Sequence, residues 1–252
     1  MKPSRNNMKI RKSADRGYVN HGWLESYHSF SFSFSFTGYY DPAYMGYSVL
    51  RVINEDVIDV GQGFGMHPHK NMEIITYMLQ GELHHEDSLG NTSVIKAGDV
   101  QCMTAGTGVV HSEFNASNTQ KAHLLQIWIF PERKLLDPGY SESHFTRAQK
   151  QDCWCLIVSH DGRENSLKIH QDVSLFATIL SAGHALDYTL HPDRSVYIQV
   201  AFGEVEVCGQ HLLAGDALMA DGAKPLTINA IVQSELLLFD LPLHGTIDIF
   251  QQ

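Results

Sequence analysis

The sequence predicts an all-β fold made of two similar β-barrel domains, and two observations lead to this prediction. Short runs of alternating apolar residues recur along the 252-residue chain, rich in Val, Ile, Tyr and Phe and separated by Gly, Asp and Asn. A phrase of the form Gly-Glu…Ala-Gly-Asp occurs near residues 81–99 and again near 203–216. Many short strands at regular spacing are typical of β-sandwiches and barrels. Because both copies of the phrase lie among such strands, two copies of one barrel unit are the economical explanation.

The expected strands follow one another in chain order without a long helical period between them. They lie at residues 47–53, 73–81, 92–106, 123–130, 152–159, 167–180, 196–209 and 234–241. The alternating Ser-Phe run at 29–36 also predicts a strand, with its phenylalanines on one face. The segment 130–151 is polar and contains Pro and Gly, as connections between domains do. We therefore expect an N-terminal domain at 1–134 and a C-terminal domain at 135–252.

Composition and charge exclude several classes of function. The formal net charge is −10 and there is no long Lys/Arg run, which argues against direct binding of nucleic acid but not against docking on a DNA-binding protein. We expect no membrane span, because no run of about 18 apolar residues occurs. No apolar stretch follows the basic start, which argues against a secretory signal peptide. The four cysteines are expected to be reduced thiols, so we expect a cytoplasmic protein.

Two short motifs point to a metal site. His67 and His69 are two residues apart, as are His111 and Glu113, and residues two apart point to the same face of a strand. If the two strands are neighbours, three imidazoles and a carboxylate converge, which is a good ligand set for a first-row divalent metal. Four protein ligands leave room for exchangeable positions, as catalytic metal sites do.

Chance pairs are also expected in a chain with 15 histidines. His84 and His85 form such a pair. Adjacent residues face opposite sides of a strand, so we assign these two histidines a surface or turn role.

The glycine spacing strengthens the metal interpretation. Gly61, His67, His69 and Glu73 have a spacing that resembles the first of the two cupin motifs, and the segment around His111 resembles the second. Longer segments are similar to the pirin family, from "RGYVNHGWLESYHSFSFSF" to "GQGFGMHPHKNMEIITYMLQG" and "MTAGTGVVHSE", and this resemblance covers nearly the whole chain.

The resemblance to pirins implies a fold and a ligand set. Pirins are bicupins, with two face-to-face β-barrels and a metal only in the N-terminal one. Their ligands match His67, His69, His111 and Glu113 of this chain. Glu73, a ligand in many other cupins, is expected behind the ligands, where it could orient an imidazole. Fe(II) is the metal that we expect first, with Ni, Co, Mn, Cu or Zn as alternatives.

The resemblance also implies an activity, that of a quercetin 2,3-dioxygenase. A flavonol binds the metal through its 3-hydroxyl, loses a proton and reacts with dioxygen; the central ring opens and carbon monoxide leaves. Glu113 is the expected catalytic base. Phe64 and Met66, which lie beside the ligands in the sequence, are expected pocket walls.

A second hypothesis comes from another class. Members of the pirin family also act as interaction proteins, so the alternative is a metal-binding, redox-responsive regulator of a transcription factor or a metabolic enzyme. A third interpretation is a detoxifying or metal-storing cupin without a specific substrate. In every case we expect a monomer that does not bind nucleic acid directly.

Overall fold

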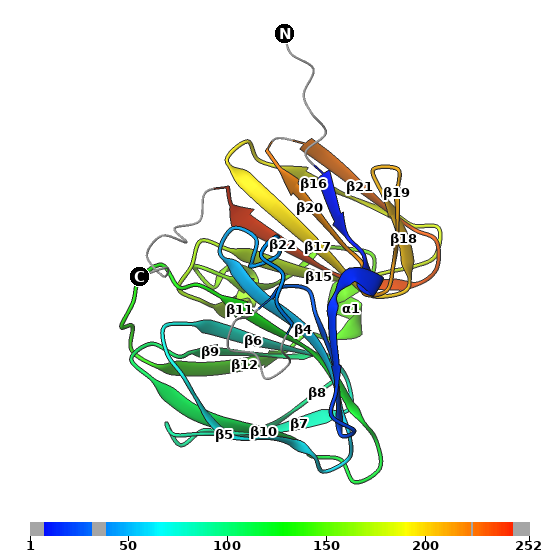
Figure 1. The fold of residues 1–252 in the computed structure, drawn as a ribbon. Helices are drawn as coiled ribbons and strands as arrows, with labels where there is room; N and C mark the ends of the chain where they lie inside the picture. The colour runs from blue at the N-terminus through cyan, green and yellow to red at the C-terminus, as the bar shows by residue number, and fades with distance from the viewer. Residues whose placement is uncertain (1–7, 32–38, 223, 244–252) are drawn as a thin grey trace. The chain divides into compact units, whose positions relative to one another are not determined.

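A computed structural model describes residues 8–31, 39–222 and 224–243, and strands make up its regular structure (Figure 1). The helical elements within this part are short: α1 (Arg147–Lys150), η1 (Ser13–Asp15) and η2 (Arg163–Asn165). No helix in these ranges is long and apolar enough to cross a membrane. The predicted all-β class is therefore confirmed.

The chain packs into two compact units, which we call the N-terminal and the C-terminal barrel. The described residues of the N-terminal barrel are 16–31, 39–146 and 157–172, and those of the C-terminal barrel are 8–15, 147–156, 173–222 and 224–243. Each compact unit combines segments from different parts of the chain. The single domain boundary expected after residue 134 stays a prediction.

The N-terminal barrel consists of two antiparallel sheets. Its strands are β2 (Gly17–Asn20), β3 (Leu24–His28), β4 (Leu50–Ile58), β5 (Gly63–His69), β6 (Glu73–Gln80), β7 (Glu82–Asp87), β8 (Thr92–Lys96), β9 (Asp99–Thr104), β10 (Val109–Asn115), β11 (Ala122–Ile129) and β12 (Gly139–His144). The larger sheet has the order β12-β9-β6-β11-β4-β3-β2, and the smaller has the order β5-β10-β7-β8. The two sheets lie opposite each other (Figure 1).

The C-terminal barrel repeats this plan. Its strands are β1 (Met8–Arg11), β15 (Ser174–Leu180), β16 (Ala185–Leu190), β17 (Arg194–Phe202), β18 (Glu204–Val207), β19 (Gln210–Leu213), β20 (Ala217–Asp221), β21 (Lys224–Ala230) and β22 (Ser234–Pro242). One sheet contains the order β1-β20-β17-β22-β15, and the other has the order β16-β21-β18-β19. Two short strands of the connecting segments, β13 (Cys155–Ser159) and β14 (Leu167–Lys168), pair in parallel.

The repeated phrase of the sequence occupies the same place in both barrels. Gly81 lies between β6 and β7, and Gly203 lies between β17 and β18, with φ of 74° and 88°. A Cβ atom would lie 2.5 Å from the carbonyl oxygen of Lys121 in the first case and of Gln233 in the second. Only glycine satisfies both conditions. The Ala-Gly-Asp half of the phrase precedes β9 and β20, so the predicted internal repeat is confirmed.

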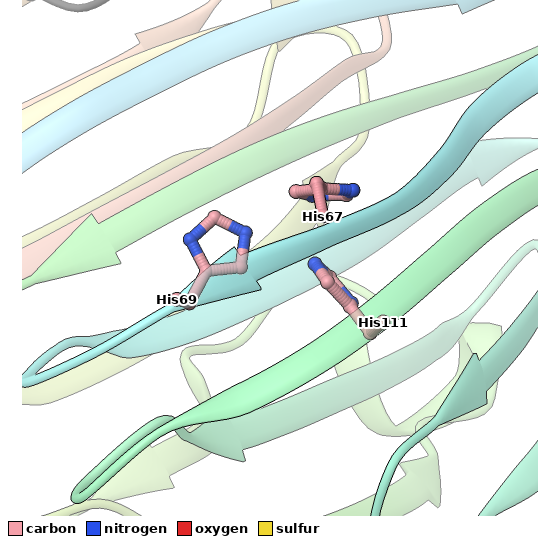
Figure 2. A group of neighbouring side chains, drawn as sticks. All are labelled: His67, His69 and His111. Atoms are coloured by element: carbon pink, nitrogen blue, oxygen red, sulfur yellow. The ribbon is translucent and has the colours of Figure 1, made fainter.

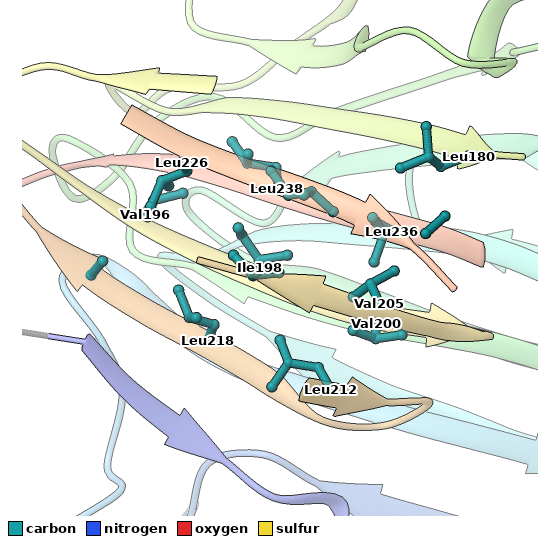
Figure 3. Close-up of a cluster of buried hydrophobic side chains, with 14 of the residues drawn as sticks. Leu180, Val196, Ile198, Val200, Val205, Leu212, Leu218, Leu226, Leu236 and Leu238 are labelled. Carbon is teal, nitrogen blue, oxygen red and sulfur yellow. The ribbon is translucent and has the colours of Figure 1, made fainter. Parts of the chain in front are cut away.

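Apolar side chains from both sheets fill the interior of the C-terminal barrel (Figure 3). The buried cluster contains Leu180, Leu190, Val196, Ile198, Val200, Val205, Val207, Leu212, Leu218, Ala220, Leu226, Ile228, Ala230, Leu236 and Leu238. The N-terminal barrel has a cluster around Met78 and Leu83 and another around Ile74 and Met103. Buried polar side chains also face its interior, and they form the site described below.

The Ser-Phe run does not continue the strand that precedes it. β3 ends at His28, and residues 29–31 are not in a strand although Phe30 is buried. The remainder of the predicted strand, residues 32–36, lies outside the described residues.

Candidate metal centre

Three histidines of the smaller N-terminal sheet face one another (Figure 2). Strands β5 and β10 pair antiparallel with His111 opposite His67, and His69 is two residues further along β5. The ring centroids are 4.4 Å apart for His67 and His111 and 4.8 Å apart for each of the other two pairs. Each ring offers one nitrogen within 4.8 Å of the other two. The spacing seen in the sequence thus brings three imidazoles together.

A β-bulge lies beside the histidines. The partner on β5 changes from His67 opposite His111 to Phe64 opposite Glu113, so β5 has one extra residue at this point. An extra residue resets the alternation of a strand. Phe64 therefore lines the same cavity as His67, whereas Met66 is 56% exposed and is not among the residues that line it.

The three imidazoles are suited to metal binding. Burial, with the neighbouring histidines, lowers the pKa of His69 and of His111 to about 3, so both rings are neutral at pH 7. His69 Nε2 and both ring nitrogens of His111 have no hydrogen-bond partner within the described structure. His67 Nδ1 lies 2.8 Å from the carbonyl oxygen of Gly65 and donates to it, so Nε2 carries the lone pair. Buried polar atoms rarely lack partners, and a divalent metal would satisfy these.

Glu113 is buried and held by Gln126 of the larger sheet, which Thr76 holds in turn. Gln126 Nε2 donates to Glu113 Oε2 at 3.0 Å and to Oε1 at 3.3 Å. Thr76 Oγ1 lies 3.5 Å from Glu113 Oε1 and donates to Gln126 Oε1 at 2.7 Å. A carboxylate oxygen of Glu113 is within 4.8 Å of a ring nitrogen of His111. The structure therefore brings Glu113 close to His111, which the two groups His67–His69–His111 and His85–His111–Glu113 share.

His85 is a residue of this site that the sequence analysis misplaced. The expectation of a surface or turn role is wrong, because His85 is fully buried on β7 with its ring 5.3 Å from that of His111. Its Nε2 lies 3.2 Å from Asp87 Oδ2, and its Nδ1 lies 3.3 Å from the amide nitrogen of Gln101. The amide can only donate, so Nδ1 accepts and Nε2 donates to Asp87.

Asp87 is the anionic end of this pair. Burial alone would raise the pKa of Asp87, but hydrogen bonds from Asn91 and His85 outweigh it and hold the pKa below its usual value. Both nitrogens of His85 are thus engaged. His85 packs against the ring of His111. It has no free lone pair to offer a metal.

Glu73 lies apart from the three histidines. Its Oε2 accepts from Thr104 Oγ1 at 2.9 Å and from the backbone N–H of His170 at 3.4 Å, and its Oε1 is 3.8 Å from His170 Nδ1. Burial raises the pKa of Glu73 to about 7. The imidazole beside Glu73 is therefore that of His170, and no described contact links Glu73 to His67, His69 or His111.

A cavity of about 710 Å³ opens beside the histidines, within the N-terminal barrel. Its lining is mostly apolar with a few polar groups, which is typical of small-molecule sites. The lining residues are His21, Trp23, Ser26, His28, Val52, Asn54, Asp56, Gly63, Phe64, Gly65, His67, His69, Glu113, Gln126 and Trp128.

The fold and the site together define a class. A two-sheet β-barrel whose interior groups three histidines, with a glutamate near one of them, beside a mostly apolar cavity has the arrangement of a cupin with a metal centre. The second barrel of the chain, with its apolar interior, makes the protein a two-domain cupin.

Comparison with known proteins identifies the family. The pirin family model matches residues 9–129, and the model of the quercetinase C-terminal cupin domain matches residues 156–241. A quercetin 2,3-dioxygenase of Escherichia coli (strain K12) is 46% identical over 233 residues, which cover 92% of this chain and 98% of the relative. A pirin-like protein of Caulobacter vibrioides is 38% identical and covers 91% of this chain and 98% of the relative.

A solved structure agrees with these matches. The crystal structure of the bacterial pirin YhhW from Escherichia coli in complex with nickel(II) superposes with a TM-score of 0.87 at 46% identity, covering 93% of this chain and 99% of YhhW. The chain belongs to the pirin family, a family of metal-binding bicupins, and the resemblance seen in the sequence is confirmed.

Proposed function

We propose that this protein is a metal-dependent dioxygenase that opens the central ring of flavonols such as quercetin with dioxygen and releases carbon monoxide. One observation carries the proposal: three imidazoles, two of them held neutral by burial, and a buried carboxylate lie beside a mostly apolar cavity of about 710 Å³. The size and lining suit a flat aromatic substrate. The quercetin 2,3-dioxygenase name of the relative with 46% identity supports the same activity.

The proposed metal ligands are His67, His69, His111 and Glu113. Neutral imidazoles with one carboxylate suit first-row divalent ions from Mn(II) to Zn(II). Fe(II) remains the ion that we expect first, and the nickel(II) complex of YhhW makes Ni(II) the first alternative to test. When bound, such an ion supplies a Lewis acid that favours the deprotonated form of a hydroxyl beside it.

The chain's own residues bind and orient the substrate. Trp23, Phe64 and Trp128 line the cavity and offer ring faces and edges to the aromatic rings of a flavonol. They also exclude water from the reacting centre. Gln126 holds the Glu113 carboxylate through both oxygens, which fixes its direction before substrate arrives.

The activity can be tested directly. The protein is loaded anaerobically with Fe(II), Ni(II), Co(II), Mn(II) or Cu(II), mixed with quercetin and then with air. We expect loss of the flavonol absorbance and release of carbon monoxide with at least one metal. His67→Ala should lower both turnover and metal content by more than about 100-fold, since it removes a ligand. His191→Ala is the matched control, because the side chain of His191 is 81% exposed in the C-terminal barrel.

Two outcomes would contradict the proposal. Absence of turnover with every metal would remove the dioxygenase function. Native turnover in both His67→Ala and Glu113→Ala would show that the reaction takes place at another site.

A further inference from the structure

A second buried carboxyl group, Asp56, faces the cavity in addition to Glu113. Asp56 lies on β4, two residues after Asn54, and both line the cavity together with His67 and His69. Its residue exposure is only 4%. Asp56 is not near enough to belong to the histidine group that could hold a metal. It is therefore a candidate for a role toward a molecule in the cavity and not toward the metal.

The hydrogen bonding of Asp56 differs from that of Glu113. Ser26 Oγ donates to Asp56 Oδ1, and no other hydrogen bond to the Asp56 carboxyl is formed by the described residues. Glu113, by contrast, has both oxygens engaged by Gln126. Asp56 Oδ2 is thus the carboxylate oxygen at this cavity that is ready to accept a further hydrogen bond.

The sheet register places Asp56 diagonally beside Gln126, the residue that holds Glu113. Asn54 lies opposite Gln126 in the pairing of β4 with β11, and Gln126 in turn holds Glu113. Asp56 is the next residue on that face of β4. Diagonal neighbours on a sheet face are within reach of long or aromatic groups. A rigid aromatic ligand with one hydroxyl at the histidines therefore has atoms within reach of Asp56.

We propose that Asp56 is a further catalytic residue, which accepts the proton of a hydroxyl group of the bound flavonol. In this step the substrate O–H bond breaks, the proton binds to Asp56 Oδ2, and the electron pair stays on the substrate oxygen. Ser26 holds the carboxyl by donating to Oδ1, which leaves Oδ2 to accept the proton. The inference rests on the proposed function and deepens it, because it adds a proton acceptor beside the predicted base Glu113.

The electrostatic setting of Asp56 supports this role. The pKa of Asp56 is raised to about 7, chiefly by burial and also by the charges of Glu113 and Glu55, against the lowering effect of the Ser26 hydrogen bond and the charge of His123. A group with a pKa near the working pH is an efficient proton acceptor, because it is ionised in part and binds a proton firmly.

Anaerobic absorption spectroscopy tests the proposal. Metal-loaded native protein and Asp56→Asn are titrated with quercetin without dioxygen, and the flavonol band is followed. We expect the native complex to show the red-shifted flavonolate band and Asp56→Asn to bind quercetin in its neutral form. After air is admitted, kcat should fall by about 10²-fold to 10⁴-fold, the range of general-base catalysis, while KM changes by less than tenfold. Metal content and thermal unfolding are measured for each variant.

Two other variants serve as comparisons. Glu206→Gln changes an exposed carboxylate of the C-terminal barrel that does not line the cavity, so its spectrum and rate should match those of the native protein. Ser26→Ala keeps the Asp56 carboxyl but releases its orientation, and we expect an intermediate loss of kcat.

The outcomes separate this inference from the proposed function. A native flavonolate band and native kcat in metal-replete Asp56→Asn would overturn the role of Asp56 and leave the dioxygenase intact. If Asp56→Asn does not fold, Asp56→Glu and Ser26→Ala decide, and native kcat in both would overturn it. Failure of the native protein itself to bind or turn over quercetin removes both proposals.

Discussion

The two barrels have the same arrangement of strands but very different interiors. In the smaller sheets, β5-β10-β7-β8 corresponds to β16-β21-β18-β19, and in the larger sheets β9-β6-β11-β4 corresponds to β20-β17-β22-β15. The repeated glycines fix the alignment, since Gly81 and Gly203 lie at equivalent turns. Thr76 and Ile198, each five residues earlier, are therefore equivalent positions. From these two positions, the pairing of each strand with its neighbour gives the equivalent residues of the two barrels.

Most residues of the metal centre have apolar counterparts. Glu113 pairs with His85 as Ile228 pairs with Val207. His111 is two residues before Glu113, and its counterpart is Leu226.

The counterparts of the other two histidines and of Gln126 follow from the same comparison of strand pairing. His67 corresponds to Tyr188 and His69 to Leu190, by their pairing with β10 and β21. Gln126 pairs with Thr76 as Leu238 pairs with Ile198, so these two are equivalent as well.

The difference shows which residues the fold itself requires. The C-terminal barrel folds with a mostly aliphatic interior. The shared arrangement of strands therefore does not require the buried polar residues of the metal centre. Buried polar groups cost stability unless they are paired, and His111 has no hydrogen-bond partner among the described residues. The N-terminal barrel therefore retains at its centre residues that oppose folding, as functional sites do.

The largest effect is expected when the glutamine of the N-terminal barrel, Gln126, is copied to its equivalent position in the C-terminal barrel, Leu238. Leu238→Gln buries an amide among aliphatic side chains that offer it no partner. We expect the free energy of unfolding to fall by about 3–4 kcal/mol, measured by denaturant titration. The control is Leu213→Gln, the same change at a residue that is 49% exposed. A loss below 1 kcal/mol in Leu238→Gln would show that this interior tolerates polar groups, and the comparison would fail.

The reverse exchange tests the metal centre. His111→Leu copies Leu226 and removes a proposed ligand, so metal affinity should fall by more than about 100-fold. Calorimetric titration with Ni(II) measures the affinity, with His144→Leu as control, because the side chain of His144 is 57% exposed. Native affinity in His111→Leu would exclude this histidine as a ligand.

A smaller effect is expected from the residue that holds Glu113. Gln126→Leu copies Leu238 and removes both hydrogen bonds to the carboxylate. Loss of such a supporting contact should lower Ni(II) affinity by about 10-fold to 100-fold. Gln120→Leu, at an exposed position, should leave the affinity unchanged. Equal affinities in the two variants would show that Gln126 does not position the ligand.

The smallest effect concerns Glu73, whose counterpart in the C-terminal barrel is Ser195. The pKa of Glu73 is raised from 4.5 to about 7, so the folded state binds its proton more tightly than the unfolded state. This contribution to stability is lost as the pH rises from about 4.5 to 7. Between pH 5 and 8 the metal-free native protein should lose about 1–2 kcal/mol more than Glu73→Gln. Denaturant titrations at each pH measure this, and parallel curves would contradict it; Glu206→Gln, at an exposed position, is the control.

The sequence was sufficient to predict the all-β class, the repeat and the convergence of three histidines. These features depend on alternation within a strand and on local glycine turns, which short segments encode. His85 was missed because its burial depends on β7 pairing with β10, opposite Glu113. A signal was present: Leu83, His85 and Asp87 alternate as the buried residues of β7.

Two other features also required the structure. A bulge shifts the phase of a strand by one residue, so alternation alone could not separate Phe64 from Met66. Glu55 and Asp56 are adjacent acids, and the choice of which one faces inward depends on the register of β4 against β3, where Asp56 lies opposite Ser26.

The pairing of β1 with β20 has a consequence for folding. Met8 lies opposite Ala220 and Arg11 opposite Ala217, so the first described strand to leave the ribosome meets its partner among the last. Such contacts of high sequence separation form late and slowly. A fragment that ends after residue 134 would carry β1 with no partner strand, and an unpaired strand edge is a template for aggregation. Expression of the N-terminal barrel alone should therefore begin after Asp15.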